Sequence, residues 1–358
     1  MPQPSRTVLM VSRGLDPVGT GRQIELAAAA FRDAGWRVHV AATTAGGAVP
    51  ERLAAAGFAM HRVATRPVVD AAAAVRLARS LRLEGPDAIL TWGRSQARLA
   101  AALRPLLPRA RLACQLGSPP RDRLTGWCLR RADLVIAGSP AVARGCGDLH
   151  VADTRVVTIP PTADPAAAAG VTRAELAVRL GLDPDTLWTL CVAPLEPEAK
   201  LERLLWAIDQ LGVVHRRLEH VLVGAGPQRP RLLRRARMQQ VDERLHVFPH
   251  LDCLPDLLRQ VAIVWQSGEV ACGGAILDGQ AVGIPAVAVD SAAARQCIVD
   301  GETGRIVPAD PESEFPRRVF GILEDDALAA RYATAAQHRT AAAFPAGGMA
   351  ALVAAVAG

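Results

Sequence analysis

Short apolar runs alternate along the chain with segments whose apolar residues recur every three or four positions. The first pattern is typical of buried strands and the second of amphipathic helices. In the first half, the strands predicted in this way are 8–12, 37–42, 88–91, 111–115, 134–137 and 156–159. The helices predicted between them are 21–34, 71–83, 95–103 and 121–131. Strands that alternate with helices favour a doubly wound, mostly parallel sheet of the α/β class.

A stretch rich in proline and alanine, from 160 to 170, interrupts the alternation and has the composition of a linker. A second series follows, with predicted strands 187–192, 219–223, 245–248, 262–265 and 286–289. The helices predicted in this series are 201–211, 229–239, 254–258 and 275–281. Only helical patterns follow residue 325. We therefore expect a Rossmann-like N-terminal domain over 1–165, a Rossmann-like C-terminal domain over 166–324, and C-terminal helices over 325–358.

Hydrophobic residues make up 50% of the 358 residues and charged residues 21%, which excludes a chain that is disordered throughout. The net charge of +6 permits an anionic partner without requiring one. The seven cysteines form no C-x-x-C pair, which favours free thiols in the cytoplasm over a zinc ribbon or a disulfide framework. The four histidines between 215 and 250 include no pair with the i, i+4 spacing of a helical metal site, so no metal is predicted.

Neither end of the chain predicts a membrane span. The N-terminal apolar run 8–11 is too short for the core of a signal peptide or for a span. Pro345, Gly347 and Gly348 interrupt the alanine-rich tail. Both observations agree with a cytoplasmic protein.

Glycine-rich turns lie between predicted strands and helices in both halves. In the first half, Gly19, Gly21 and Arg22 stand at the turn between strand 8–12 and helix 21–34. Glycine lets the backbone approach a ligand closely, and the N-terminus of the following helix favours an anion such as phosphate. These three residues are therefore candidates for binding a nucleotide.

The second half repeats this arrangement twice. Gly224, Gly226 and Pro227 follow one predicted strand, and Gly273 and Gly274 open a later helix. The backbone N–H groups at such a helix start can meet a diphosphate. Because both turns follow strands of one parallel sheet, they predict a phosphate-containing ligand at the carboxyl edge of that sheet.

Two charged side chains stand near these turns. Lys200 is the only lysine among the 41 basic residues, and it lies at the turn after the first strand of the second half. An ammonium group is a usable point charge for binding phosphate. Asp278 lies one turn into the helix that Gly274 opens, where a carboxylate can accept hydrogen bonds from ribose hydroxyls.

A series of short motifs stands in a fixed order along nearly the whole chain. They are Gly19-x-Gly21-Arg22, Gly35-Trp36-Arg37-Val38, Ala132-Asp133, Ile159-Pro160-Pro161, Leu195-Glu196-Pro197-Glu198-Ala199-Lys200, Gly224-x-Gly226-Pro227, Ala281-x-Gly283-x-Pro285 and Asp300-Gly301-Glu302-Thr303-Gly304. In these residues the chain resembles the family 4 glycosyltransferases of the GT-B fold. The resemblance implies two Rossmann-like domains that face a cleft, with the helices of 325–358 crossing back toward the N-terminal domain.

The resemblance also implies an activity. Such enzymes transfer a sugar, usually a hexose, from a nucleotide-sugar donor to an acceptor hydroxyl, with retention at the anomeric carbon and without a metal or a cofactor. An arginine and a lysine after the first strand of the second half hold the diphosphate of the donor. Two acidic residues in an E-x7-E pattern hold the sugar and the ribose.

The chain departs from the family pattern at both of these points. Pro194 stands at the position of the diphosphate arginine, and Lys200 stands one residue after the position of the lysine. Val270 and Asp278 occupy the two E-x7-E positions, so Asp278 keeps a carboxylate where the ribose is expected. Glu269, displaced by one residue, is the remaining candidate for the sugar hydroxyls. Glu269 and Asp278 are therefore the predicted catalytic residues.

The acceptor side departs further. Many family members carry histidine in the strand ends that correspond to 91–93 and 115–117, and this chain has none in either segment. Trp92, Arg94 and Gln115 are the side chains left there to meet an acceptor. Three functions stay open: a glycosyltransferase of glycan, polysaccharide or glycolipid synthesis, a catalytically degenerate paralogue that binds ligands or regulates, and a nucleotide-sugar epimerase of the same fold.

Arginines are concentrated between Arg76 and Arg131. This segment contains twelve arginines and only three acidic residues. A basic field of this kind suits a peripheral contact with the inner face of a membrane or with a lipid-linked glycan acceptor. Solvated helix faces are the alternative reading of the same charges. No nucleic-acid partner is predicted.

Overall fold

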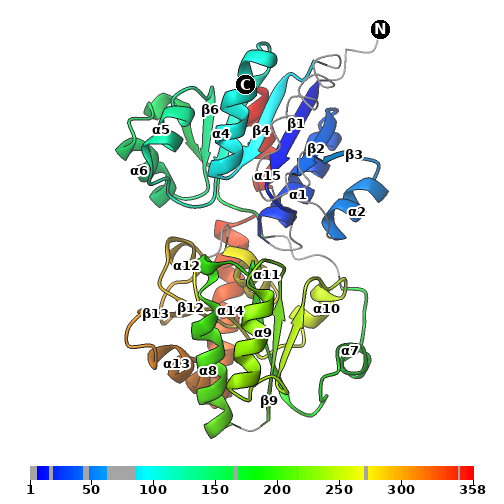
Figure 1. Ribbon diagram of the computed structural model, residues 1–358, viewed down its shortest axis with the longest axis vertical. Coiled ribbons are helices and arrows are strands. Elements are labelled where there is room, and N and C mark those ends of the chain that lie inside the picture. Colours follow the sequence, from blue (N-terminus) through cyan, green and yellow to red (C-terminus); the bar gives the residue numbers. More distant parts are fainter. Residues whose placement is uncertain are drawn as a thin grey trace. The chain divides into compact units, whose positions relative to one another are not determined.

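The computed structural model describes residues 6–15, 19–42, 48–62, 85–163, 168–215, 217–269, 273–345 and 347–358. Contacts group the chain into two compact units, Met1–Thr162 together with Ala346–Gly358, and Ala163–Pro345. Each unit carries one parallel sheet with helices packed on it (Figure 1). The predicted α/β class is confirmed.

The sheet of the first unit has seven strands in the order β3-β2-β1-β4-β5-β6-β7, and every neighbouring pair runs parallel. Its strands are β1 (Thr7–Ser12), β2 (Arg37–Ala42), β3 (Ala59–Arg62), β4 (Ala88–Trp92), β5 (Arg111–Leu116), β6 (Leu134–Ala137) and β7 (Val156–Thr158). Its helices are α1 (Thr20–Asp33), α2 (Ala48–Ala55), α4 (Arg94–Leu103), α5 (Arg123–Leu129), α6 (Pro140–Asp148) and α15 (Gly348–Ala357), with 3-10 turns at Arg104–Leu106 and Asp153–Arg155. The last helix, α15, packs against α1.

The sheet of the second unit has six strands in the order β10-β9-β8-β11-β12-β13, again all parallel. Its strands are β8 (Leu187–Val192), β9 (Leu218–Val223), β10 (Leu245–Phe248), β11 (Ile263–Gln266), β12 (Ala286–Val289) and β13 (Gly304–Val307). Its helices are α7 (Arg173–Leu180), α8 (Leu201–Val214), α9 (Arg229–Met238), α10 (Leu254–Leu258), α11 (Gly274–Ala281), α12 (Ala292–Cys297), α13 (Glu314–Leu323) and α14 (Asp326–Ala343), with a 3-10 turn at Pro197–Ala199.

All eleven predicted strands are confirmed to within one residue at either end. The predicted helix 71–83 lies outside the described residues. The predictions missed seven elements, none longer than ten residues: α2, β3, α6, α7, α12, β13 and α13. Two residues of β13 are only half-buried, so this edge strand carries no continuous apolar run.

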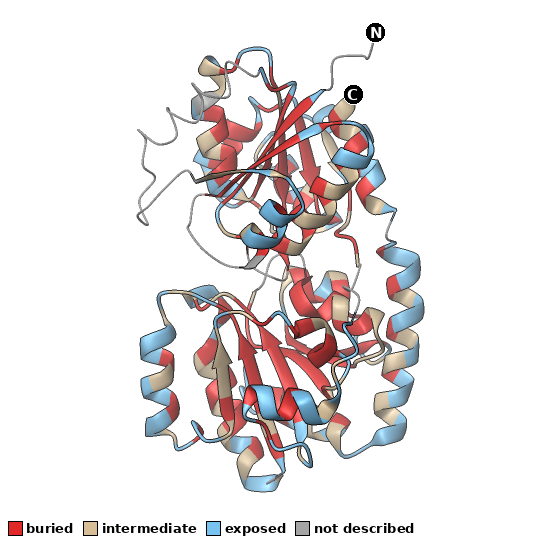
Figure 2. Ribbon diagram, turned by 90° about the vertical axis from the view of Figure 1, so that its right-hand side faces the viewer, coloured by how far each residue is buried: buried red, intermediate tan, exposed pale blue. Residues whose placement is uncertain are grey.

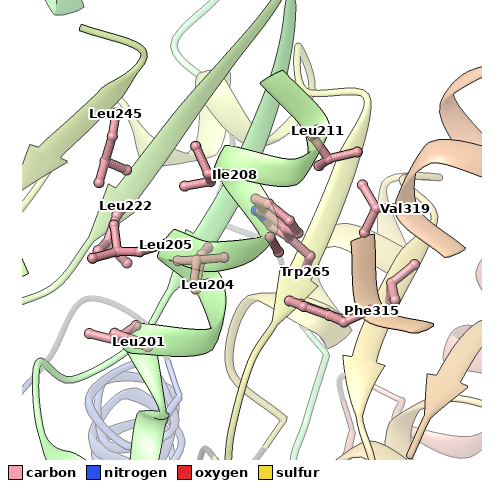
Figure 3. Close-up of a cluster of buried hydrophobic side chains, with 14 of the residues drawn as sticks. Leu201, Leu204, Leu205, Ile208, Leu211, Leu222, Leu245, Trp265, Phe315 and Val319 are labelled. Atoms are coloured by element: carbon pink, nitrogen blue, oxygen red, sulfur yellow. The ribbon is translucent and has the colours of Figure 1, made fainter. Parts of the chain in front are cut away.

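The core of the second unit forms because apolar residues of α8 recur on one face of the helix. Figure 3 shows this face, with Leu204, Leu205 and Ile208, directed toward the sheet. Trp265 of β11 stacks on Phe315 with 5.4 Å between ring centroids, and both side chains are fully buried. Burying one such side chain contributes roughly 1.5–3 kcal/mol. Figure 2 shows the same pattern in both sheets, whose strands are mostly buried, whereas the outer faces of the helices are exposed.

The order of each sheet reverses direction at one place. In the first unit, β2 and β3 follow β1 toward one edge of the sheet, whereas β4 pairs with the other side of β1 and β5 to β7 continue toward the opposite edge. The reversal therefore falls between β1 and β4. In the second unit the reversal falls between β8 and β11. Open parallel sheets bind ligands outside the carboxyl ends of the strands at such a switch point. The loops that follow these four strands are therefore where a site is expected.

The apolar tail contains the one stretch in the described residues, 326–357, that is long and apolar enough to cross a membrane by composition. The structure divides it into α14 and α15, because the helix ends before Phe344 and Pro345. Tyr332 of α14 belongs to the core of the second unit, and Val356 of α15 belongs to a core of the first unit. The tail thus supplies two core helices, one to each unit.

The buried imidazole of His220 should make the stability of the second unit depend on pH. The side chain is buried beside β8, where Thr189 Oγ1 and His220 Nδ1 lie 2.8 Å apart, and burial lowers the pKa of His220 from 6.5 to about 3. Below about pH 6.5 the unfolded chain binds a proton there that the folded chain does not bind until about pH 3. The free energy of unfolding should therefore fall by up to about 1.4 kcal/mol per pH unit across this window. Urea unfolding of His220→Gln should show a flatter pH dependence than the wild type, and equal slopes would contradict this account.

Candidate functional site

Three loops meet at the carboxyl edge of the second sheet, after β9, β8 and β11. The middle one, residues 193–200, connects β8 to α8 and is called here the central loop. The backbone N–H of Leu195 donates to the carbonyl of Ala225 at 3.0 Å, and the N–H of Gln228 donates back to the carbonyl of Leu195 at 3.0 Å. These bonds fasten the central loop to the turn between β9 and α9.

Gly224 and Gly226 make this fastening possible. A Cβ on Gly224 would lie 1.9 Å from the carbonyl oxygen of Ala193, and a Cβ on Gly226 would lie 2.5 Å from that of Leu195. Real Cβ atoms do not come so close to backbone, so both positions require glycine. The structure therefore gives these predicted nucleotide-binding glycines a role in loop packing, while Pro227 beside them is exposed.

The loop after β11 holds the central loop from the other side. Ser267 Oγ donates to the carbonyl of Ala199 at 2.8 Å, and the N–H of Glu269 donates to the carbonyl of Glu198 at 3.1 Å. A Cβ on Gly268 would lie 2.4 Å from that same Glu198 oxygen. The central loop is thus clamped between two neighbours by backbone contacts on both sides.

Arg203 is part of this clamp, and the sequence did not single it out. Its guanidinium donates to the carbonyl of Ser267 at 3.3 Å and to that of Ala309 at 3.2 Å. The available signal was its position three residues after Lys200, which places both residues at the start of α8. Arg203 ties the loop after β11 to the loop after β13.

Lys200 occupies an unusual backbone conformation. With φ of 51° and ψ of 43° it is left-handed, and it forms the junction between the 3-10 turn and α8. A left-handed residue other than glycine costs about 1 kcal/mol or more. The side chain is exposed and forms no ion pair with the residues that the structure describes. The chain therefore keeps its only lysine where glycine would be less strained.

The helix α11 starts beyond the loop after β11. Gly273 and Gly274 are both left-handed, with φ of 70° and 48°, and a Cβ on Gly273 would lie 2.3 Å from Cys297 Sγ. Asp278 is half-buried one turn further on. Glu269 is also half-buried, and the first position of the E-x7-E pattern, Val270, lies outside the described residues. Among the residues the structure describes, no three His, Cys, Asp or Glu side chains are grouped to hold a metal ion.

In the first unit, the loop after β1 leads into α1. Gly19 is left-handed, with φ of 61°, and caps the helix, and Gly21 is buried in its first turn. Arg22 forms an ion pair with Glu25 at 3.7 Å, and Glu25 also receives a hydrogen bond from Arg52 at 2.8 Å. The guanidinium of Arg22 is thus held to the surface of its own helix.

Trp92 and Gln115 lie side by side at the ends of β4 and β5. They are direct partners in the parallel register, so both side chains leave the same face of the sheet. Each residue is 4% exposed, and neither the indole Nε1 nor the amide Oε1 has a hydrogen-bond partner among the described residues. Buried polar atoms without a partner are rare in native proteins, and a ligand or a water usually satisfies them. Arg94, the first residue of α4, is exposed next to them.

Several arginines of the basic field of 76–131 have defined partners. Arg98 lies 2.7 Å from Asp122, and Arg104 lies 2.9 Å from Asp133. A hydrogen bond from a backbone N–H in α5 lowers the pKa of Asp122, and the Arg98 guanidinium lowers it further. Asp122 and Asp133 are therefore each paired with an arginine of this field. Outside the described residues lie Arg76, Arg79 and Arg82.

Two parallel sheets with glycine-containing loops at their switch points are the architecture of GT-B glycosyltransferases. The solved structure of HepE from Anabaena, in complex with UDP and glucose, superposes with a TM-score of 0.81 over 98% of both chains, at 17% identity. The fold is therefore GT-B, as the resemblance implied. Residues 18–167 match the family model "Glycosyltransferase Family 4", and residues 187–325 match the model "Glycosyl transferases group 1". The chain belongs to the family 4 glycosyltransferases.

Two curated relatives carry more specific names. The chain is 28% identical over 178 residues to a D-inositol 3-phosphate glycosyltransferase of Streptomyces bingchenggensis. The aligned region covers 46% of this chain and 39% of that protein. It is 38% identical over 72 residues to a phosphatidyl-myo-inositol mannosyltransferase of Mycolicibacterium smegmatis. This aligned region covers 20% of this chain and 19% of that protein. The similarity thus spans less than half the length of either relative.

Proposed function

We propose that this protein transfers a sugar from a nucleotide-sugar donor to an acceptor hydroxyl, with retention at the anomeric carbon and without a metal or a cofactor. The observation that carries the proposal is the clamped central loop at the switch point of the second sheet, which presents Lys200 at its end. The structurally similar HepE was crystallised in complex with UDP and glucose. Both curated relatives are named as enzymes that transfer sugars.

The second unit supplies the groups for the donor. The N–H groups at the start of α11 and the ammonium of Lys200 would hold the diphosphate, and Asp278 would accept hydrogen bonds from the ribose. Three glycines would keep the loops packed closely together, so that their backbone stays in position to bind the donor: Gly224, Gly226 and Gly268. Because the donor's nucleoside diphosphate departs as an anion, fixed positive groups of this kind lower the barrier to transfer.

The first unit supplies groups for the acceptor. A hydroxyl both accepts and donates a hydrogen bond, so one hydroxyl can satisfy the indole N–H of Trp92 and the amide oxygen of Gln115 together. Arg94 beside them suits an acceptor that carries a phosphate. An acceptor rich in hydroxyls, either a sugar or polyol or a lipid-linked glycan, fits these groups. We include in the proposal a cytoplasmic location and a peripheral contact with the membrane.

A second function is favoured by one specific observation. Pro194 and Val270 replace two of the polar residues that the family uses for the donor. A protein that binds the nucleotide sugar without transferring it would tolerate both replacements. The two functions differ in whether the donor is turned over, so an assay of turnover separates them.

Asp278→Asn tests the transfer reaction directly. A thermal-shift screen of UDP, GDP, ADP and their sugars first identifies the donor, because a ligand that binds only the folded state raises the melting temperature. With that donor and excess protein, we expect slow release of nucleoside diphosphate from the wild type. The rate of release by Asp278→Asn should be at least about tenfold lower, since a hydrogen bond to a charged group contributes about 1.5–3 kcal/mol.

The matched control is Asp326→Asn, which removes an exposed carboxylate at the start of α14. This variant should release nucleoside diphosphate at the wild-type rate. If the wild type and Asp278→Asn both release at the rate of protein-free buffer with every donor that binds, the protein is a binding protein rather than a transferase.

A further inference from the structure

The short helix α5 carries two large apolar side chains on its outer surface. Leu124 is 55% exposed and Trp127 is 48% exposed, and their spacing of three residues places them on one face of the helix. Thr125 and Cys128 on the other face are buried. Trp127 is the only aromatic residue among the large apolar side chains that are exposed in the described part of the chain. Figure 1 shows α5 on the outside of the first unit, near α4 and α6.

Arginines surround these two side chains. Arg121, Arg123 and Arg131 are exposed, and the guanidinium of Arg131 lies over the Trp127 ring, 4.6 Å from its centroid. We call the set of Arg121, Arg123, Leu124, Trp127 and Arg131 the α5 patch.

The two acidic residues nearest in sequence to the α5 patch are each paired with an arginine. The carboxylate of Asp122 lies 2.7 Å from Arg98, and that of Asp133 lies 2.9 Å from Arg104. Each carboxylate is thus matched by an arginine that is not part of the patch. The three arginines of the patch therefore present a net positive surface around an apolar centre.

The α5 patch also has a defined place in the fold. The chain leaves the carboxyl end of β5 just after Gln115, passes through 117–122 and enters α5. Arg121 and Arg123 at the start of α5 therefore lie toward the edge of the sheet that carries Trp92 and Gln115. A surface bound by the patch would lie next to the groups proposed for the acceptor.

We infer that the α5 patch docks the protein onto an anionic lipid surface. This inference rests on the membrane contact included in the proposed function and assigns it to particular residues. Tryptophan prefers the interface between water and lipid, where its ring is apolar and its N–H is hydrated. Arginines around it are attracted by anionic headgroups. One leucine and one tryptophan bury too little area for permanent insertion, so docking should be reversible and sensitive to salt.

Another basic surface in the chain provides a matched control. The helix α9 carries five arginines that are all exposed and no acidic residue, and its Met238 is 79% exposed. It has no aromatic residue. Replacing Arg234 and Arg237 of α9 by glutamine removes two positive charges. This is the same number that Arg121→Gln/Arg123→Gln removes from the α5 patch.

The test is sedimentation of the full chain with vesicles of phosphatidylcholine, with and without phosphatidylglycerol. The wild type should bind only the anionic vesicles, and added salt should release it. Leu124→Ser/Trp127→Ser should weaken binding about tenfold or more, as expected from the apolar area it removes. Arg121→Gln/Arg123→Gln should weaken binding and reduce its dependence on salt, whereas Arg234→Gln/Arg237→Gln should bind like the wild type.

Fluorescence provides a second measurement on intact protein. Trp36, Trp92, Trp188 and Trp265 are buried, and Trp206 is half-buried in α8 of the second unit. A blue shift of emission on adding anionic vesicles should therefore come from Trp127, and it should disappear in Trp127→Phe. Each variant should keep the wild-type melting temperature and its shift with nucleotide, which separates failed docking from failed donor binding. Loss of vesicle binding in the α9 variant, equal binding by all variants, or no binding by the wild type would each overturn the inference. Binding to an acidic protein or a nucleic acid in place of the vesicles would assign the patch to a different partner.

Discussion

Replacement of Lys200 by glycine is expected to stabilise the folded chain by about 1 kcal/mol and to weaken nucleoside diphosphate binding about tenfold or more. The two effects have opposite signs because they act through different parts of the residue. Glycine relieves the left-handed backbone at φ of 51°, which an L side chain rarely adopts. The same change removes the ammonium group proposed to hold the diphosphate. Urea unfolding measures the first effect, and titration calorimetry with the diphosphate and the uncharged nucleoside measures the second.

Two matched variants separate these effects. Lys200→Ala removes the charge but keeps a left-handed residue, so it should weaken binding without stabilising the fold. Gln240→Gly relieves a left-handed residue with φ of 57° after α9, so it should stabilise the fold without changing binding. If Lys200→Gly binds the diphosphate as tightly as the wild type, the lysine is a surface charge. Equal losses for the diphosphate and the nucleoside would mean that it acts through loop structure.

Gly224→Ala is expected to have the largest effect on stability, about 3 kcal/mol or more, together with loss of nucleotide binding. The added Cβ would lie 1.9 Å from the carbonyl oxygen of Ala193, which belongs to backbone and cannot swing aside like a flexible side chain. The central loop must therefore move away from the turn after β9. That movement would break the hydrogen bond from Leu195 to Ala225 and would displace Lys200 at the end of the loop.

The control for Gly224→Ala is Gly212→Ala, within α8. There the added Cβ meets only the terminal nitrogen of Arg244, at 3.1 Å, which is the end of a flexible side chain. Alanine also favours a helix interior over glycine, so this variant should be neutral or slightly stabilising. Urea unfolding of both variants gives the comparison. An unchanged midpoint in Gly224→Ala would show that the loops can separate without cost, and the clamp would then have no bearing on the site.

The sequence predicted the central strands of both sheets because these strands are buried on both faces and read as continuous apolar runs. It did not predict α6, whose residues Gly145 and Gly147 interrupt the helical pattern, nor β13, which is half-exposed at a sheet edge. In both places packing in the folded chain outweighs the local preference of the residues. The strand order is also invisible to periodicity, and only the structure establishes it.

The candidate site was predictable at its turns but not in its contacts. Gly224 and Gly226 marked a tight turn, yet nothing near them in the sequence indicated Ala193 and Leu195 as their neighbours. The clamp on the central loop is made largely of backbone hydrogen bonds, and backbone groups are the same in every residue. Arg203 likewise binds carbonyl oxygens, so its partners leave no trace in residue type. Such contacts follow from the fold and become visible only with it.

The position of α15 has a consequence for how the protein is made. Met349, Leu352 and Val356 share a hydrophobic core with Val8 and Phe31 in the first unit. During translation the ribosome delivers β1 and α1 early, but it delivers α15 only after the whole second unit has been synthesised. Until then the apolar surface that α15 covers is exposed on the nascent first unit. The first unit therefore begins to form before the second and finishes after it, and a fragment that ends at Thr162 would lack part of its own core.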